Sequence, residues 1–212
     1  MNQVNQKDFI NSRSAGIAFI RWNNKNKVWE SLMGISESGT EFLGGKKEDS
    51  LNETTEHTAY REFFEETGKV LPDYWKSQFM RLCYKRYRDG SYTKGFNKIY
   101  IKEGKYTLYV INLSIFEREL RNDIDYLPRK YNQMYNGVID YSVGREMKNL
   151  MWISFDNLVK NSKRNRNFAN IILKNYISEL IKFSQMPIYY NSVKLFQGNE
   201  HKIIKNKPNL KT

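Results

Sequence analysis

Residues 44–70 read GGKKEDSLNETTEHTAYREFFEETGKV, a stretch in which two adjacent glycines precede a dense group of acids. Its second half has the spacing of a helix from residue 53 to residue 67. We predict that Ser50 and Glu53 form a capping box where this helix begins. Gly68 follows the last helical residue, so it is expected to end the helix in a left-handed conformation. The chemistry of this stretch then depends on which side chains the helix carries on its surface.

Three glutamates of the helix carry the chemistry that we predict. Glu62 and Glu66 are one turn apart and Glu65 is three residues from Glu62, so their carboxylates fall within an arc of about 100°. Like charges at that proximity repel one another and need a compensating cation. Hard oxygen ligands suit Mg²⁺ or Mn²⁺ better than zinc. The sequence therefore predicts a metal site at Glu62, Glu65 and Glu66.

Other residues of the stretch are placed to support this site. Arg61 precedes Glu65 by four residues and can hold that acid in place. Glu53 lies near the start of the helix, where its charge also favours the helix dipole. Gly44 and Gly45 permit backbone geometries that other residues resist, so a carbonyl oxygen or an amide can approach a metal ion or a phosphate closely. We expect Gly45 among the metal ligands and both glycines beside a diphosphate.

The order of these residues is more restrictive than a solvated acidic helix face, which is the ordinary alternative. It resembles the Nudix box, whose pattern is Gly, five residues, Glu, seven residues, Arg-Glu-apolar-x-Glu-Glu-x-Gly-apolar. The matching residues are Glu53, Arg61, Glu62, Phe63, Glu65, Glu66 and Gly68. Two positions depart from the pattern. Seven residues rather than five separate Gly45 from Glu53, and Lys69 occupies the final apolar position.

The flanking sequence extends the resemblance over residues 14–183. SAGIAFIRW (14–22) looks like the first core strand of the family, EFLGGK (41–46) like the strand before the box, and MWISFDNL (151–158) like the closing strand and helix start. The resemblance implies an α/β/α sandwich with a mixed sheet, followed here by a C-terminal helix and a basic tail. TAYREFFEETGK and the basic C-terminal region look most like viral members, including baculovirus ADP-ribose pyrophosphatase-like and poxvirus mRNA-decapping proteins.

The resemblance also implies a reaction, the hydrolysis of a diphosphate bridge. Glu62, Glu65 and Glu66 would hold one or more Mg²⁺ or Mn²⁺ ions, and Arg61 and Glu53 would orient these glutamates. The ions neutralise developing charge and help to ionise the water that attacks a bridged phosphorus. The base is a helix glutamate or a loop acid. Family members often place an acid before the last strand, so Glu146 is named for this role, with an ordinary surface glutamate as the alternative.

The rest of the chain is predicted to complete a sheet and to add one helix. We expect strands at 14–22, 28–36 and 150–155, a central strand at 106–113, and a hairpin of 79–88 and 92–101 around Asp89-Gly90. We also expect an irregular insertion at 118–141 that can include a short helix, and a helix at 167–186. A chain of 212 residues is long enough for one well-buried core. We therefore predict a single domain over residues 1–186 and a loosely ordered basic tail over 187–212.

The composition of the chain limits which cellular compartments and which binding partners we expect. No apolar run is long enough to span a membrane, the first residues lack the apolar core of a secretory signal, and Cys83 is the single cysteine. These features predict an intracellular protein, in the host cytoplasm or nucleus if the viral resemblance holds. The formal net charge of +12 favours polyanionic partners such as RNA.

One basic strip suits RNA in particular. Residues 85–98, KRYRDGSYTKGFNK, interleave Lys and Arg with aromatic residues, an arrangement that fits phosphate contacts and base stacking. A solvated hairpin whose aromatic side chains pack inward is the alternative. The residues predicted to bind substrate are Gly44, Gly45, Lys46, Lys85, Arg86 and Arg88. We expect the substrate to be the mRNA 5′ cap, which the enzyme would remove.

Other substrates and one other class of protein fit the same residues. ADP-ribose, or another nucleoside diphosphate linked to a second group, would use the same box without an RNA track. A diphosphoinositol phosphate is also compatible with the charge. A non-catalytic RNA-binding module of the same fold would typically have lost box acids, so the intact Glu62, Glu65 and Glu66 disfavour it.

Overall fold

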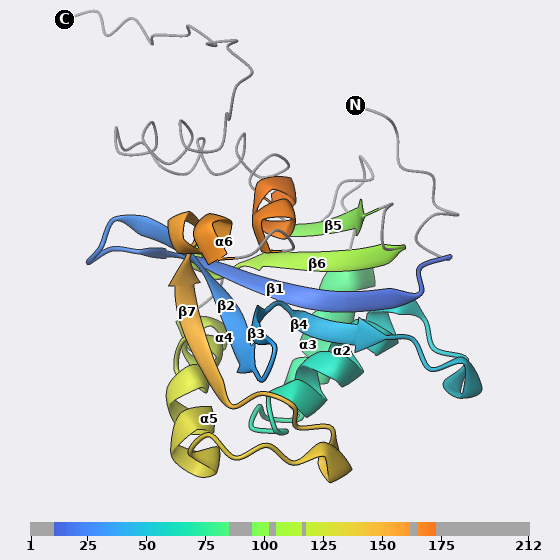
Figure 1. The fold of residues 1–212 in the computed structure, drawn as a ribbon. Coiled ribbons are helices and arrows are strands. Elements are labelled where there is room, and N and C mark those ends of the chain that lie inside the picture. The colour runs from blue at the N-terminus through green and yellow to red at the C-terminus, as the bar shows by residue number, and fades with distance from the viewer. Residues whose placement is uncertain (1–10, 85–94, 102–104, 116–117, 162–164, 173–212) are drawn as a thin grey trace, which may run out of the picture.

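The structure, a computed structural model, describes residues 11–84, 95–101, 105–115, 118–161 and 165–172. These residues build one seven-stranded sheet with helices on both of its faces (Figure 1). The strands follow the order β3-β2-β1-β6-β5, while β4 pairs with β1 and β7 pairs with β2. Their bounds are β1 (Ser14–Asn23), β2 (Val28–Ser36), β3 (Gly39–Glu41), β4 (Leu43–Lys46), β5 (Phe96–Ile101), β6 (Tyr106–Asn112) and β7 (Asn149–Ser154).

The sheet is mixed because β1 runs parallel to β6 and antiparallel to β2 and β4. The predicted hairpin of β1 and β2 is confirmed, with Trp22 opposite Trp29. The predicted central strand is confirmed in β6, all of whose residues are buried. A strand covered on both faces has no solvent side, so it carries a continuous apolar run instead of an alternating one.

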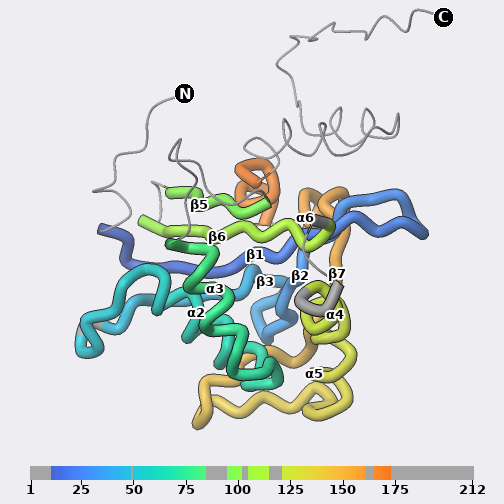
Figure 2. The backbone as a smooth tube through the Cα atoms, turned by 180° about the vertical axis from the view of Figure 1, so that it is seen from behind, coloured from blue at the N-terminus to red at the C-terminus, as the bar shows by residue number. Residues whose placement is uncertain are grey.

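Helices cover the two faces in separate layers. Figures 1 and 2 show α2 and α3 against one face, with α6 and the helical residues 165–172 against the other. The α-helices are α2 (Thr55–Glu66), α3 (Tyr74–Tyr84), α4 (Arg118–Asp125), α5 (Leu127–Tyr135) and α6 (Phe155–Asn161), and the 3₁₀ turns are η1 (Asp49–Leu51), η3 (Leu113–Ile115) and η4 (Tyr141–Val143). None of the helices in the described residues has both the length and the apolar character that a membrane span needs.

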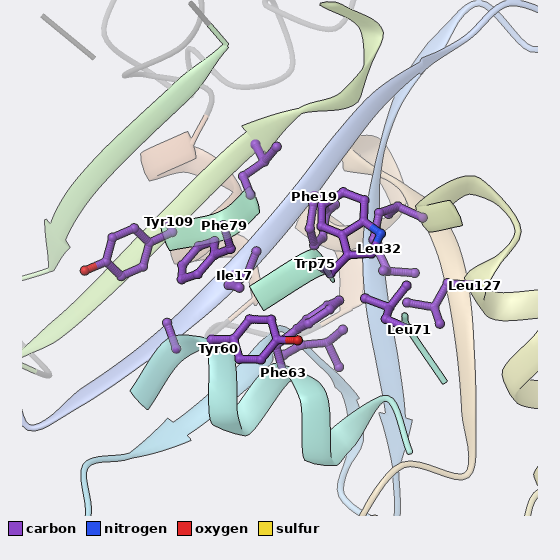
Figure 3. Close-up of a cluster of buried hydrophobic side chains, with 14 of the residues drawn as sticks. Ile17, Phe19, Leu32, Tyr60, Phe63, Leu71, Trp75, Phe79, Tyr109 and Leu127 are labelled. Atoms are coloured by element: carbon purple, nitrogen blue, oxygen red, sulfur yellow. The ribbon is translucent and has the colours of Figure 1, made fainter. Parts of the chain in front are cut away.

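Alternate residues of β1 supply the two cores. Ile17 and Phe19 belong to the core beneath α2 and α3, whereas Ala18 and Ile20 belong to the core beneath α6. In the first core the rings of Phe19 and Phe63 lie 5.2 Å apart. Figure 3 shows both within the cluster that joins α2 to the sheet. Since α2 lies within the 44–70 stretch, we call it the box helix. The predicted α/β/α sandwich with a mixed sheet is therefore confirmed.

The predicted strand at 79–88 is wrong, because residues 74–84 form the helix α3. Its buried side chains are Trp75, Phe79, Leu82 and Cys83, which recur at helical spacing and pack beneath the sheet. The strand β5 exists, but its partner is β6 and no strand precedes it at 79–84. The Asp89-Gly90 turn lies outside the described residues.

The prediction of an irregular insertion at 118–141 with one short helix at most is also wrong, since two helices, α4 and α5, occupy most of it. Ile124, Leu127 and Tyr131 are fully buried against the core beneath α2. An apolar stripe this sparse becomes helical through packing, because short helices gain most of their stability from tertiary contacts. Asn136 ends α5 with φ of 43°.

The box helix begins later than predicted. Thr54 is its N-cap and accepts a hydrogen bond from the amide of His57, whereas Ser50, predicted for this role, lies in η1. Glu53 consequently stands just outside the helix. The predicted end is confirmed, because Gly68 has φ of +63°. The helix predicted at 167–186 is seen as far as residue 172, and the remainder and the tail lie outside the described residues.

Candidate active site

The guanidinium of Arg61 lies at the centre of a half-buried acidic cluster beside the box helix. Its Nε donates to Glu53 Oε1 at 2.7 Å, its Nη1 lies 3.0 Å from Glu65 Oε2, and its Nη2 lies 3.0 Å from Glu62 Oε1. Glu48 adds a longer ion pair at 3.4 Å. The hydrogen bond to Glu53 and the charges of Glu62, Glu53 and Glu65 raise the pKa of Arg61 despite its partial burial. One cation thus holds several carboxylates in a fixed arrangement.

Glu53 anchors this arrangement from outside the helix. Its side chain is buried, which alone would raise its pKa, but hydrogen bonds from Arg61, the Glu48 amide and the Thr58 hydroxyl lower the pKa below its ordinary value. The ionised form is therefore the one that the fold favours. Glu53 lies outside the helix, just before the N-cap, so its side chain can extend along the first turns and reach Arg61.

The two glycines of β4 lie directly against the box acids. The amide of Gly44 donates to Glu66 Oε2 at 2.7 Å. A Cβ atom on Gly45 would overlap the carboxylate of Glu62, so only glycine allows this approach. Gly44 pairs with Gly16 of β1, which fixes the position of both glycines relative to the sheet. The predicted close approach of the backbone occurs here, against carboxylate groups.

Negative charge accumulates where the glycines and the helix meet. Burial raises the pKa of Glu66 well above its ordinary value, and the carboxylates of Glu62, Glu146 and Glu41 raise it further against the hydrogen bond from Gly44. Burial also raises the pKa of Glu62, with Arg61 opposing the shift and Glu65 and Glu146 adding to it. An added cation would relieve this repulsion.

The donor chemistry of the cluster fits the predicted ions. Carboxylate oxygens of Glu62, Glu65 and Glu66 and a backbone carbonyl at Gly45 are hard ligands of the kind that Mg²⁺ and Mn²⁺ take. As the side chains stand, no three His, Cys, Asp or Glu residues of the described part form a ready set of ligands. Arg61 engages Glu62 and Glu65, and Glu66 faces the amide of Gly44. The roles of these residues as ligands remain predictions.

A loop that follows α5 reaches the same acids. Gly144, with φ of +72°, lies so close to Glu65 that an added Cβ would be 3.2 Å from Glu65 Cβ. The guanidinium of Arg145 stacks 4.0 Å above the ring of Tyr135, whose hydroxyl donates to the carbonyl of Gly68 at 2.6 Å. The loop is thereby tied to the end of the box helix. It brings the exposed Glu146 within electrostatic reach of the cluster.

The structure gives a different result for the strip at 85–98, which was predicted to bind RNA. Lys85, Arg86 and Arg88 lie outside the described residues. Phe96 is only 2% exposed and packs in the core, so its ring is not available to a base. Lys98 makes an ion pair of 2.7 Å with Glu56. For Phe96 the inward-packing alternative is correct. Lys46 does lie beside the box, with its side chain exposed and its carbonyl accepting from Arg61 Nη2 at 3.0 Å.

Four residues near the cluster were missed from the sequence. Glu48 falls in the lengthened loop before Glu53, where the family pattern assigns no acid. Thr58 and Glu41 carry no pattern that separates them from ordinary polar residues. Gly144 belongs to a segment without a predicted element. The extra length of the loop at Glu48 was a usable signal. Thr58 contacts Glu53, five residues away, but nothing in its sequence context distinguishes it. Glu41 and Gly144 reach the cluster through contacts between distant segments.

Comparisons with known proteins place few limits on this site. No protein-family model matches the sequence, and no curated protein matches it either. The solved structure of an Ap4A hydrolase from C. elegans superposes with a TM-score of 0.38 at 12% identity, over 80% of this chain and 98% of that one. The fold class therefore rests on the chain's own sheet and helices, and its chemistry on its own side chains.

Proposed function

We propose that this chain is a hydrolase of the Nudix type that cleaves a diphosphate bridge in a nucleotide substrate with the help of Mg²⁺ or Mn²⁺. One observation carries the proposal. The carboxylates of Glu62 and Glu66 abut Gly45 and Gly44, so the box helix and the glycine strand form one surface of oxygen ligands and backbone groups. A solvated acidic helix face would have no reason to require glycine at this position.

Different residues of the chain have different roles in the proposed reaction. Bound at Glu62, Glu65 and Glu66, a divalent ion supplies neutralisation of phosphate charge and ionisation of a water molecule. Arg61 holds two of these glutamates at fixed positions, and Glu53 holds Arg61. Charged groups that are already in position do not have to reorient when charge develops in the transition state, so the barrier of the reaction is lower.

The proposed reaction also needs a general base, and we assign this role to Glu146. Glu146 is exposed on a loop that is tied to the box helix, and its charge acts on both Glu62 and Glu66. A carboxylate in this place can take a proton from water, which contributes roughly 10²–10⁴-fold to the rate of such reactions.

For the substrate we propose the mRNA 5′ cap, released as methylated GDP. The support is the net charge of +12, which favours a polyanion larger than a single nucleotide, together with the resemblance to viral decapping proteins. ADP-ribose and a diphosphoinositol phosphate present the same bridge to the same acids. A non-catalytic RNA-binding role would leave the ligand surface at Glu62 and Glu66 unused.

A side-by-side assay tests the proposal. Purified protein is incubated with labelled capped RNA, ADP-ribose and a diphosphoinositol phosphate, each with Mg²⁺, with Mn²⁺ and with a chelator. We expect metal-dependent release of methylated GDP. Turnover of ADP-ribose with capped RNA untouched would exclude decapping. The variant Glu65→Gln/Glu66→Gln should lose every activity, and full turnover by this variant would overturn the metal assignment.

A further inference from the structure

Three basic residues lie side by side at one end of the sheet. The amide of Arg13 donates to the carbonyl of Lys105 at 2.8 Å, and the amide of Lys47 donates to the carbonyl of Arg13 at 2.9 Å. These bonds continue the ladders in which Ser14 pairs with Lys46 and with Tyr106. Arg13, Lys47 and Lys105 therefore form a row across three adjacent strand ends, which we call the basic row.

The basic row costs stability unless an anion joins it. Adjacent strands are about 4.8 Å apart, and like charges placed opposite one another across strands are destabilising. Arg13 and Lys105 are exposed and Lys47 is partly exposed. Within the part of the chain that the structure describes, none of the three makes an ion pair with an acid. The arrangement concentrates positive charge at an accessible edge.

The basic row adjoins the candidate active site. Lys47 stands between Lys46, whose carbonyl accepts from Arg61 Nη2, and Glu48, whose carboxylate pairs with Arg61 Nη1. Lys47 is also two residues from Gly45, so both lie on the same face of the sheet, the face on which Gly45 meets Glu62. A substrate chain leaving the acidic cluster past Lys46 would meet the basic row next.

We propose that the basic row binds the phosphodiester backbone of single-stranded RNA as it leaves the diphosphate site. This inference rests on the proposed function for the direction of the chain. It is independent of the 85–98 strip, and it assigns the RNA contact to residues that are far apart in the sequence. Contacts to backbone phosphates carry no base preference, so the row adds affinity without sequence specificity.

A charge-matched pair of triple variants tests the basic row. The row variant is Arg13→Gln/Lys47→Gln/Lys105→Gln, and the control is Lys25→Gln/Lys27→Gln/Lys130→Gln. Lys25 and Lys27 lie exposed in the turn at the other end of β1, and Lys130 is exposed on α5. Each variant removes three positive charges. Each also changes one lysine with positive φ, 46° at Lys105 and 54° at Lys27. Matching melting temperatures of the two variants confirm equal folding.

Binding of a fluorescently labelled single-stranded RNA is measured by anisotropy over a range of salt. We expect the affinity of the row variant at low salt to fall by about tenfold, and its plot of log affinity against log salt to become shallower by about 2, since each phosphate contact on a single strand contributes roughly 0.7. The control should keep the wild-type slope. Equal losses in both variants, or none in the row variant, would overturn the proposal.

Two further measurements are added. The first distinguishes RNA from other polyanions, and the second distinguishes the basic row from the proposed function. Poly-glutamate and inorganic tripolyphosphate serve as competitors, and displacement of RNA by either at equal charge would show that the row recognises charge and not an RNA chain. The ratio of kcat/KM for capped RNA to that for a cap dinucleotide should fall about tenfold in the row variant. If the protein hydrolyses neither substrate, the proposed function fails, while the salt-dependent binding still decides the basic row.

Discussion

Arg61 Nε lies 2.7 Å from Glu53 Oε1, although eight positions separate the two residues in the chain. The contact exists because Glu53 precedes the N-cap Thr54 and turns toward the helix, while Arg61 points back from the second turn. The other nitrogens of the guanidinium then reach Glu62 and Glu65. Arg61 therefore organises the acidic cluster through its planar group with several donors.

Replacing Arg61 by lysine should damage activity far more than it damages the fold. A lysine ammonium keeps the charge but cannot hold carboxylates on three sides. We expect kcat on a nucleotide substrate to fall about 100-fold, the loss typical when positioning is disturbed. The control is Arg21→Lys, which breaks a similar pair of contacts to Glu30 and Asp125 away from the site. Equal loss of kcat in both variants would contradict this role.

The contact between Gly45 and Glu62 predicts a second outcome. Gly45→Ala would place its Cβ in overlap with Glu62 Oε2, so the carboxylate at the end of this flexible side chain must move away. We expect the free energy of unfolding to change by less than about 1 kcal/mol, because a side-chain end and not the backbone has to give way. Turnover should be lost, because Glu62 would leave its position beside Arg61. Chemical denaturation and a kinetic assay measure the two effects, and full turnover by this variant would contradict the role of the contact.

The ion pair of Lys98 and Glu56 should contribute to stability rather than to RNA binding. Their side chains are 11% and 13% exposed. Removing one partner of a buried pair leaves the other charge uncompensated, so Lys98→Met should lower the free energy of unfolding by about 3 kcal/mol at pH 7. Lys148→Met is the control, because Lys148 and Glu37 are exposed and 3.9 Å apart. A loss of RNA affinity with unchanged stability would favour the strip instead.

The same pair predicts how this stability depends on pH. Burial raises the pKa of Glu56, but Lys98 more than offsets it and holds the pKa at about 2, below the ordinary 4.5. The ionised glutamate therefore stabilises the fold fully above pH 4.5, and this contribution disappears as the pH falls toward 2. The difference between wild type and Lys98→Met in urea unfolding should shrink over that range. A constant difference from pH 7 to pH 2.5 would contradict the pairing.

Glu146 offers a test of the loop. Glu146→Gln removes a base but keeps the shape of an exposed side chain, so we expect kcat to fall about 100-fold while stability changes by less than about 0.5 kcal/mol. Glu37→Gln is the matched control, because Glu37 is also an exposed loop acid. Wild-type kcat in the Glu146 variant would assign the base to a helix glutamate.

Local patterns were sufficient for the elements that depend on neighbouring residues. The strand at 14–22, the hairpin with 28–36 and the left-handed end at Gly68 are confirmed because alternation, turn chemistry and glycine act over a few residues. The pairing of Arg61 with Glu65 is confirmed for the same reason, since four residues make one helical turn. The strand predicted at 79–88 failed because aromatic residues suit strands and buried helices alike.

The sequence by itself determined the composition and spacing of the acidic cluster, because a helix repeats every 3.6 residues wherever it stands. Tertiary structure decided what surrounds that cluster. The glycines of β4, the Gly144 loop and the basic row come from segments that the chain separates widely. Burial of β1 and β6 beneath two helical layers brings those segments together, and neither burial nor strand pairing is a property of any one local stretch.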